Sequence, residues 1–168
     1  EDFSEEAYFD VIRKKTAALF KASSQSGAVS VGAVQEEVMK AGLLGEMIGI
    51  AFQIKDDIFD YFESPELGKP TGNDMLEGKL TLPALYVLNQ TGDDSLKQAA
   101  LRIRSLEASK EEIANFVETV KEKGGIEYAT RMMYEFRDKA LALVPASADS
   151  SLKEALTAYI DYVIERNK

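Results

Sequence analysis

Residues 53–60, Gln53-Ile54-Lys55-Asp56-Asp57-Ile58-Phe59-Asp60, decide how the fold of this chain is interpreted. Each residue turns an α-helix by about 100°. With Gln53 at zero, the three aspartates therefore all lie within about 60° of it, on one stripe of a predicted helix. The opposite side is apolar and is expected to be buried. Its members are Ile48, Ala51, Ile54, Ile58 and Phe62.

The acidic stripe predicts a cation site. Three carboxylates on one side of a helix repel one another, so a positive group should lie against them. The chain contains no histidine and no cysteine, and oxygen ligands alone favour Mg²⁺ over zinc or copper. The metal ligands predicted here are Asp56, Asp57 and Asp60. A solvated acidic patch on a surface helix is the alternative interpretation.

A loop with two lysines follows this helix. Ser64-Pro65 breaks the helix, and the next residues bring Lys69 and Lys79 together with Gly68, Gly72 and Gly78. Lysines act as mobile point charges for phosphate, and glycines let backbone N–H groups approach an anion. This arrangement indicates a clamp for a metal-bound polyanion.

The combined pattern resembles a known family. It reads Gln53-x-x-Asp56-Asp57-x-x-Asp60, then Gly68-Lys69-Pro70-x-Gly72-x-Asp74-x-x-Glu77-Gly78-Lys79-x-Thr81-Leu82-Pro83. This long pattern closely resembles the second aspartate-rich motif of the all-trans polyprenyl diphosphate synthases. The resemblance continues at Tyr8 and in Lys15-Thr16-Ala17-Ala18-Leu19-Phe20. It covers residues 1–168, but only the C-terminal part of the family's sequence.

The resemblance implies an all-α fold, a helical bundle of the class I isoprenoid synthase (terpenoid synthase) type. It also implies an Mg²⁺-dependent prenyltransferase that condenses an allylic diphosphate with isopentenyl diphosphate to form an all-trans polyprenyl diphosphate. The matching residues look more like bacterial medium- and long-chain, octaprenyl-type synthases, which usually work as homodimers. A homodimer and a long-chain product are therefore expected.

The resemblance also assigns roles to single residues. The Lys15-Thr16 pair is similar to the pair that contacts the allylic diphosphate and the developing cation. Lys15, Lys69 and Lys79 would add positive charge to the leaving pyrophosphate. Thr16 and Gln53 would offer oxygen dipoles to the cation. For Lys15, a solvated basic turn is the alternative from the residues alone.

Composition limits the other classes of function. The chain has 168 residues and a net charge of −9, and an acidic surface argues against a nucleic-acid partner. No apolar run approaches the ~20 residues of a membrane span. Absence of cysteine fits the cytoplasm. Glu1 is not a usual start residue, so we expect the chain to begin inside a longer protein.

Helical periodicity accounts for the rest of the chain. We expect helices at residues 1–24, 34–62 and 81–89, followed by segments that begin near Asp93, at the Ser109-x-x-Glu112 capping box, at Ile126 and at Ser150 or Ser151. Gly42, Gly45 and Gly49 lie on the side of Gln53. They indicate either close helix packing or room for a hydrocarbon chain.

Several alternatives can be weighed on spacing. The Gly72 to Lys79 spacing is one residue too long for a P-loop, and the helix-phased aspartates do not fit an EF-hand. A class I terpene cyclase would share the fold, but the lysine loop resembles the chain-elongating enzymes. The chain lacks the family's first aspartate-rich motif, since Asp93-Asp94 is followed by Ser95-Leu96-Lys97. We therefore expect a folded fragment that is inactive alone. A non-catalytic, dimerising helical subunit is the rival hypothesis.

Overall fold

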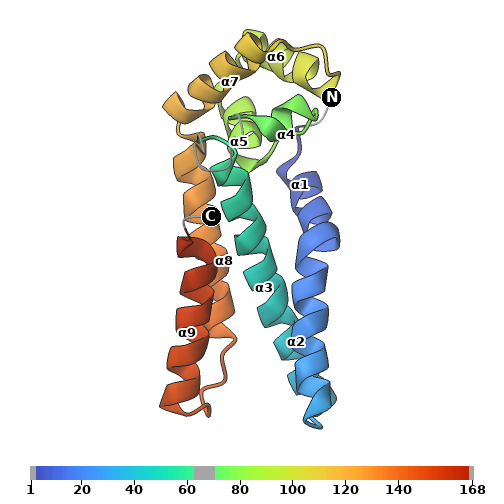
Figure 1. The fold of residues 1–168 in the computed structure, drawn as a ribbon, viewed down its shortest axis with the longest axis vertical. Coiled ribbons are helices and arrows are strands. Elements are labelled where there is room, and N and C mark those ends of the chain that lie inside the picture. The colour runs from blue at the N-terminus through green and yellow to red at the C-terminus, as the bar shows by residue number, and fades with distance from the viewer. Residues whose placement is uncertain (1–2, 63–70, 167–168) are drawn as a thin grey trace. The chain divides into compact units, whose positions relative to one another are not determined.

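The structure is a computed structural model that describes residues 3–62 and 71–166. These residues form helices and connecting turns, and within the two ranges no strand occurs, so the all-α prediction is confirmed. In the same ranges, no helix is both long enough and apolar enough to cross a membrane. The elements are α1 (Glu5–Ile12), η1 (Arg13–Ala17), α2 (Ala18–Ser30), α3 (Gln35–Phe59), α4 (Asn73–Leu76), α5 (Leu82–Thr91), α6 (Asp94–Arg104), α7 (Lys110–Glu122), α8 (Gly125–Ala142) and α9 (Ser150–Glu165) (Figure 1).

The chain divides into two compact units, each made of two stretches of sequence. The first unit is Glu1–Tyr8 with Asp56–Thr130, and the second is Phe9–Lys55 with Arg131–Lys168. The boundary passes through α3 between Lys55 and Asp56, so the acidic stripe belongs to the first unit and Gln53 to the second.

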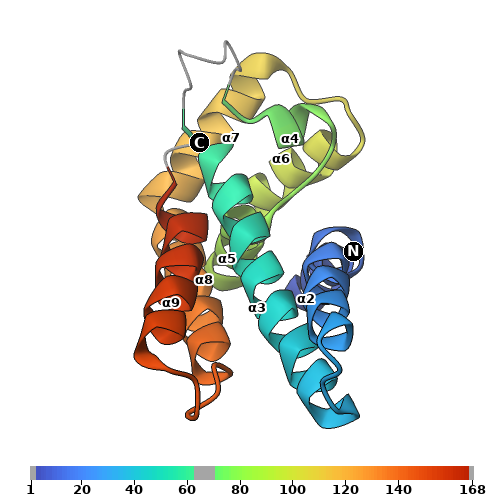
Figure 2. The ribbon, with the colours of Figure 1, turned by 60° about the horizontal axis from the view of Figure 1, so that its bottom comes forward.

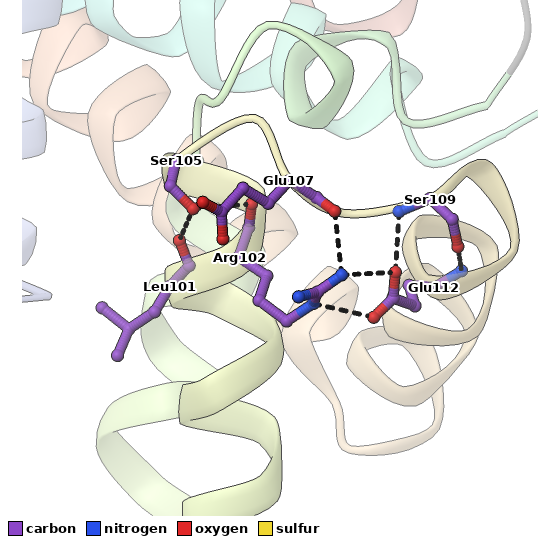
Figure 3. A network of polar contacts seen from close by, with 6 residues as sticks. All are labelled: Leu101, Arg102, Ser105, Glu107, Ser109 and Glu112. Carbon is purple, nitrogen blue, oxygen red and sulfur yellow. Dashed lines mark hydrogen bonds and ion pairs between the residues drawn. The ribbon is translucent and has the colours of Figure 1, made fainter.

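The first unit is built around the buried helix α5. Pro83 occupies its first turn, where the missing proline N–H costs nothing. The short helix α4 contacts both α6 and α7, and α7 contacts α5. The turn between α6 and α7 is fixed by a polar network (Figure 3), in which Arg102 binds Glu112 and the capping box of Ser109 with Glu112 is complete. The core of this unit includes Leu82, Val87, Ile103, Val117 and Val120.

In the second unit, α3 packs closely against η1 and α2 along its glycines. A Cβ added to Gly49 would lie 2.6 Å from Ala17 Cα, and one on Gly45 would lie 2.5 Å from the Phe20 carbonyl oxygen. The close-packing interpretation of these glycines is therefore confirmed. In the same unit, residues 131–142 of α8 run beside α9 (Figures 1 and 2), and the two helices are joined by an ion pair of 2.6 Å between Arg137 and Asp161.

The structure corrects several predicted boundaries. Helical structure continues past the expected end at residue 24, to Ser30, and includes a π-helical segment at η1. Helix α3 ends at Phe59, so Phe62 lies beyond it and is 46% exposed instead of buried. Helix α9 does start at Ser150, but its cap is Asp149, which accepts the Leu152 N–H at 2.8 Å. The one-turn helix α4 was not predicted, because four residues are too few to show helical periodicity.

Candidate functional site

The acidic stripe at the end of α3 is held by its own neighbours in the first unit. Asp57 is buried, with 4% of its surface exposed, and its Oδ2 accepts a hydrogen bond of 2.5 Å from the hydroxyl of Tyr8. Burial and the charge of Asp57 raise the pKa of Tyr8 well above its ordinary value. The Tyr8 hydroxyl therefore stays protonated and keeps donating to the carboxylate.

Asp60 closes the chain onto the start of α4. Its Oδ1 accepts the Asn73 N–H and its Oδ2 accepts the Asp74 N–H, both at 3.0 Å, and its carbonyl accepts the Gly72 N–H at 2.8 Å. These bonds satisfy N–H groups that a helix start leaves without intrahelical partners. Burial raises the pKa of Asp60, although the two N–H donors oppose that change. Burial outweighs them because the carboxylate has lost much of its hydration.

Tyr61 lies next to this stripe and is 1% exposed. Burial raises the pKa of its hydroxyl, while the nearby Thr81 side chain and Ala84 N–H act in the opposite sense. Neither group is close enough or suitably oriented for a hydrogen bond, so the Tyr61 hydroxyl has no hydrogen-bond partner among the described residues. The first unit thus contains two buried tyrosines, of which one is bonded to a carboxylate and one is not.

The structure describes only one of the two lysines of the predicted clamp. Lys79 is exposed, and its ammonium pairs with Glu77 and lies 3.8 Å from Asp74. The hydrogen bond that Lys79 donates to Glu77 raises the pKa of Lys79, so the lysine keeps its charge. Lys69 lies outside the described residues. The structure therefore leaves the clamp as a prediction and adds two carboxylates as partners of Lys79.

The second unit brings Thr16 and Gln53 together. The Thr16 hydroxyl donates to Gln53 Oε1 at 2.7 Å in a partly buried contact. Because its proton is used in this bond, Thr16 can present only oxygen lone pairs to a further group. Thr16 and the exposed Lys15 both lie in the π-helical segment η1, and such segments are frequent at functional sites.

The donor chemistry of the stripe suits Mg²⁺, which binds through one or two carboxylates and takes its other ligands from water and phosphate. Asp56 is half-buried on α3, and Asp57 and Asp60 are fixed by the bonds above. Among the described residues, no group of three or more histidine, cysteine, aspartate or glutamate side chains is arranged to hold a metal ion. The fit to Mg²⁺ therefore rests on the type of donor, three carboxylates on one stripe, and the metal site stays a prediction.

The all-α fold is that of the isoprenyl diphosphate synthases of the terpenoid synthase type. Residues 1–120 match the polyprenyl synthetase family, and the chain belongs to that family.

Named relatives agree with this assignment. The chain is 34% identical over 168 residues to the short chain isoprenyl diphosphate synthase of Methanothermobacter thermautotrophicus, covering 98% of this chain and 50% of that protein. It is 37% identical over 157 residues to heptaprenyl diphosphate synthase component 2 of Geobacillus stearothermophilus, covering 91% and 48%. A crystal structure of geranylgeranyl pyrophosphate synthase from Bacteroides thetaiotaomicron is 57% identical, with a TM-score of 0.93, over 98% of this chain and 55% of that one. The chain thus spans about half the length of the relatives it matches.

Sequence reasoning missed the internal partners of the stripe. Tyr8 was expected to matter only through the family resemblance, and its bond to Asp57 spans 49 positions. The capping of α4 by Asp60 was missed for the same reason, since no local pattern links residues so far apart. The sequence did carry one usable signal, because Asn73-Asp74 directly after a glycine is typical of a turn that opens a helix.

Proposed function

We propose that the whole protein containing this chain is an Mg²⁺-dependent prenyltransferase that condenses an allylic diphosphate with isopentenyl diphosphate to give an all-trans polyprenyl diphosphate. The observation that carries the proposal is the family match over residues 1–120, which includes the acidic stripe and the Thr16–Gln53 pair. The 168 residues would form the part of the synthetase domain that carries the second aspartate-rich motif.

The acidic stripe would hold Mg²⁺ through Asp56, with Asp57 and Asp60 contributing directly or through water. When bound, the ion would supply charge neutralisation for the departing pyrophosphate. The Tyr8 and Asn73–Asp74 bonds keep two of the three carboxylates in place before any ligand arrives. This preorganisation lowers the cost of orienting them during the reaction.

The lysines would bind the diphosphate. Lys15 is exposed and can reach an anion from η1. Lys79 would exchange its contacts with Glu77 and Asp74 for the pyrophosphate oxygens, and Lys69 would bind the same diphosphate. Together these cations stabilise the negative charge that develops as the C–O bond ionises.

Thr16 and Gln53 would stabilise the allylic cation. The Thr16 proton is committed to Gln53 Oε1, so the hydroxyl oxygen is oriented with its lone pairs outward. The proton lost in the last step would pass to the pyrophosphate itself.

Replacing Asp56 tests the proposal in the whole protein. Asp56→Ala should reduce turnover of an allylic diphosphate with isopentenyl diphosphate by about 100-fold or more. Asp94→Ala removes an equal charge from a side chain that is 96% exposed on α6 and should leave turnover unchanged. Near-normal turnover of Asp56→Ala with an intact Mg²⁺ requirement would contradict the proposal.

Product length and assembly belong to the same proposal. We expect a long-chain product and a homodimer, from the resemblance of the motifs. The relatives carry names from geranylgeranyl to nonaprenyl diphosphate synthase, so their names do not select a length. Chromatography of the products and light scattering of the whole protein decide both points, and cytoplasmic location stays a prediction.

A further inference from the structure

Tyr8 reaches the acidic stripe from the start of the chain. Its hydroxyl and Asp57 Oδ2 are 2.5 Å apart in a buried contact, and the Tyr8 side chain is as inaccessible as the core around it, with 9% of its surface exposed. A buried carboxylate keeps its full desolvation cost when its donor is removed. The Tyr8 hydroxyl is therefore one of the groups that stabilise the Asp57 carboxylate in its observed orientation.

The segment that carries Tyr8 is itself anchored. The Phe3 carbonyl accepts a hydrogen bond of 3.0 Å from Asn89 Nδ2, and the Arg104 guanidinium lies 5.1 Å from the centre of the Phe3 ring. The carboxylate of Glu5 accepts a bond of 2.6 Å from the hydroxyl of Tyr128. Residues 3–8 are thus fixed to α5, α6 and α8 within the first unit, and Tyr8 is a rigid donor.

We propose that Tyr8 is a positioning residue for the acidic stripe: its buried hydroxyl fixes the carboxylate of Asp57 and thereby sets the affinity of the stripe for Mg²⁺. The inference rests on the proposed function, because it assumes that the stripe binds a metal. It concerns a residue that would touch neither the metal nor the substrate. Removal of partners that orient metal ligands commonly weakens metal binding by about 10- to 100-fold.

Tyr61 provides a matched control in the same unit. Its hydroxyl is also buried, on a residue that is 1% exposed, but has no hydrogen-bond partner among the described residues. Tyr8→Phe and Tyr61→Phe therefore each delete the hydroxyl of a buried tyrosine. Only the first deletion breaks a bond to the stripe.

The experiment measures Mn²⁺ binding to the whole protein by electron paramagnetic resonance, in the presence of inorganic pyrophosphate. Tyr8→Phe should raise the dissociation constant about tenfold, whereas Tyr61→Phe should change it by less than about twofold, as expected when no bond is lost. Binding is measured where thermal melting shows each variant to be folded. An unchanged affinity in Tyr8→Phe, or equal losses in both variants, would overturn the proposal.

A measurement on the unmutated protein covers the case in which Tyr8→Phe does not fold. With ¹³Cζ-labelled tyrosine, addition of Mg²⁺ and pyrophosphate should shift the Tyr8 resonance and leave that of Tyr61 in place. An unmoved Tyr8 signal at saturating Mg²⁺ contradicts the proposal. Neither readout needs turnover, so a protein that makes no prenyl product would refute the proposed function and still allow Tyr8 to be judged.

Discussion

The carboxylate of Glu112 has several donors although its side chain is 42% exposed. It accepts bonds from Arg102 Nε at 2.9 Å and from the Ser109 N–H at 2.7 Å (Figure 3). The Arg102 guanidinium, followed by the Ser109 donors, lowers the pKa of Glu112 to about 2. A carboxyl whose pKa is lower in the folded state stabilises the fold above its unfolded pKa, and this contribution disappears as the pH falls through the folded value.

Glu112→Gln tests this network. The variant should be less stable than the unmodified chain at pH 6, and the difference should shrink as the pH falls from about 4.5, the ordinary glutamate value, toward 2. Urea unfolding at several pH values measures the difference. Arg102→Gln should remove the largest part of this contribution, so the double variant should lose less than the sum of the two single losses. A difference that does not vary with pH would contradict the prediction.

Leu106 has a backbone conformation that suits glycine. Its φ is +62°, and it follows the end of α6, where the Leu106 and Glu107 N–H groups bind the carbonyls of Ile103 and Arg102. Glycine is the usual residue at this position of a helix end, and Leu106 is 66% exposed.

Leu106→Gly should therefore stabilise the chain by about 0.5–1 kcal/mol, because relief of the left-handed strain exceeds the loss of a mostly exposed side chain. Ser105→Gly is the control. Because Ser105 has a φ of −83°, glycine relieves no strain there, and this variant should be less stable than the unmodified chain. Thermal melting compares the two variants. A loss of stability in Leu106→Gly would show that the contacts of the leucine side chain outweigh the strain of its backbone.

At the scale of elements, the close approach of α3 to η1 and α2 depends on glycine. Gly49→Ala would place a Cβ 2.6 Å from Ala17 Cα, and backbone cannot move aside as the end of a side chain can. We expect a loss of about 1–3 kcal/mol in the free energy of unfolding, as for other overpacked contacts.

Gly27→Ala should change the free energy of unfolding in the opposite direction. Gly27 lies within α2, and an added Cβ would meet nothing within 4 Å. Alanine should stabilise the helix there by about 0.5–1 kcal/mol. Chemical denaturation of both variants decides the matter: equal effects at Gly49 and Gly27 would mean that helix propensity, and not the close packing of α2 and α3, governs these positions.

Most of the helices could be predicted from the sequence, and each helix or boundary that was missed has a physical cause. The capping box at Ser109 and the cap at Asp93 were visible because caps are local patterns. The π turn at η1 was not, because side-chain periodicity reports a helix without distinguishing a wider turn. Phe62 was expected inside because the pattern was continued past Phe59, where the helix ends.

At the scale of the whole molecule, the chain spans about half of each relative. We predict that the 168 residues alone give no polyprenyl product from Mg²⁺, an allylic diphosphate and isopentenyl diphosphate, because one acidic stripe should bind Mg²⁺ only weakly. Incubation with radiolabelled isopentenyl diphosphate measures this, with the whole protein as the positive control. Steady product formation by the 168 residues would show that a single stripe suffices.

The candidate site was predictable in its residue types but not in its partners. The spacing of Asp56, Asp57 and Asp60 defined one stripe, and α3 carries Asp56 and Asp57 in its last turn, with Asp60 directly after it. The bonds that hold Asp57 and Asp60 come from Tyr8 and from Asn73 and Asp74. Such pairs form only after the chain has folded, so neither periodicity nor composition contains them.

The π segment η1 also has a consequence for how relatives can differ in length. A π turn holds about one residue more than an α turn, so Arg13–Ala17 can be regarded as a one-residue insertion that the helix has absorbed. Deleting Lys14 would restore an unbroken α-helix and turn residues 9–12 by about 100° relative to α2. A homologue with a regular helix at this place should therefore show a single-residue gap, and that gap should be tolerated only where the side chains before it have changed to match their new direction.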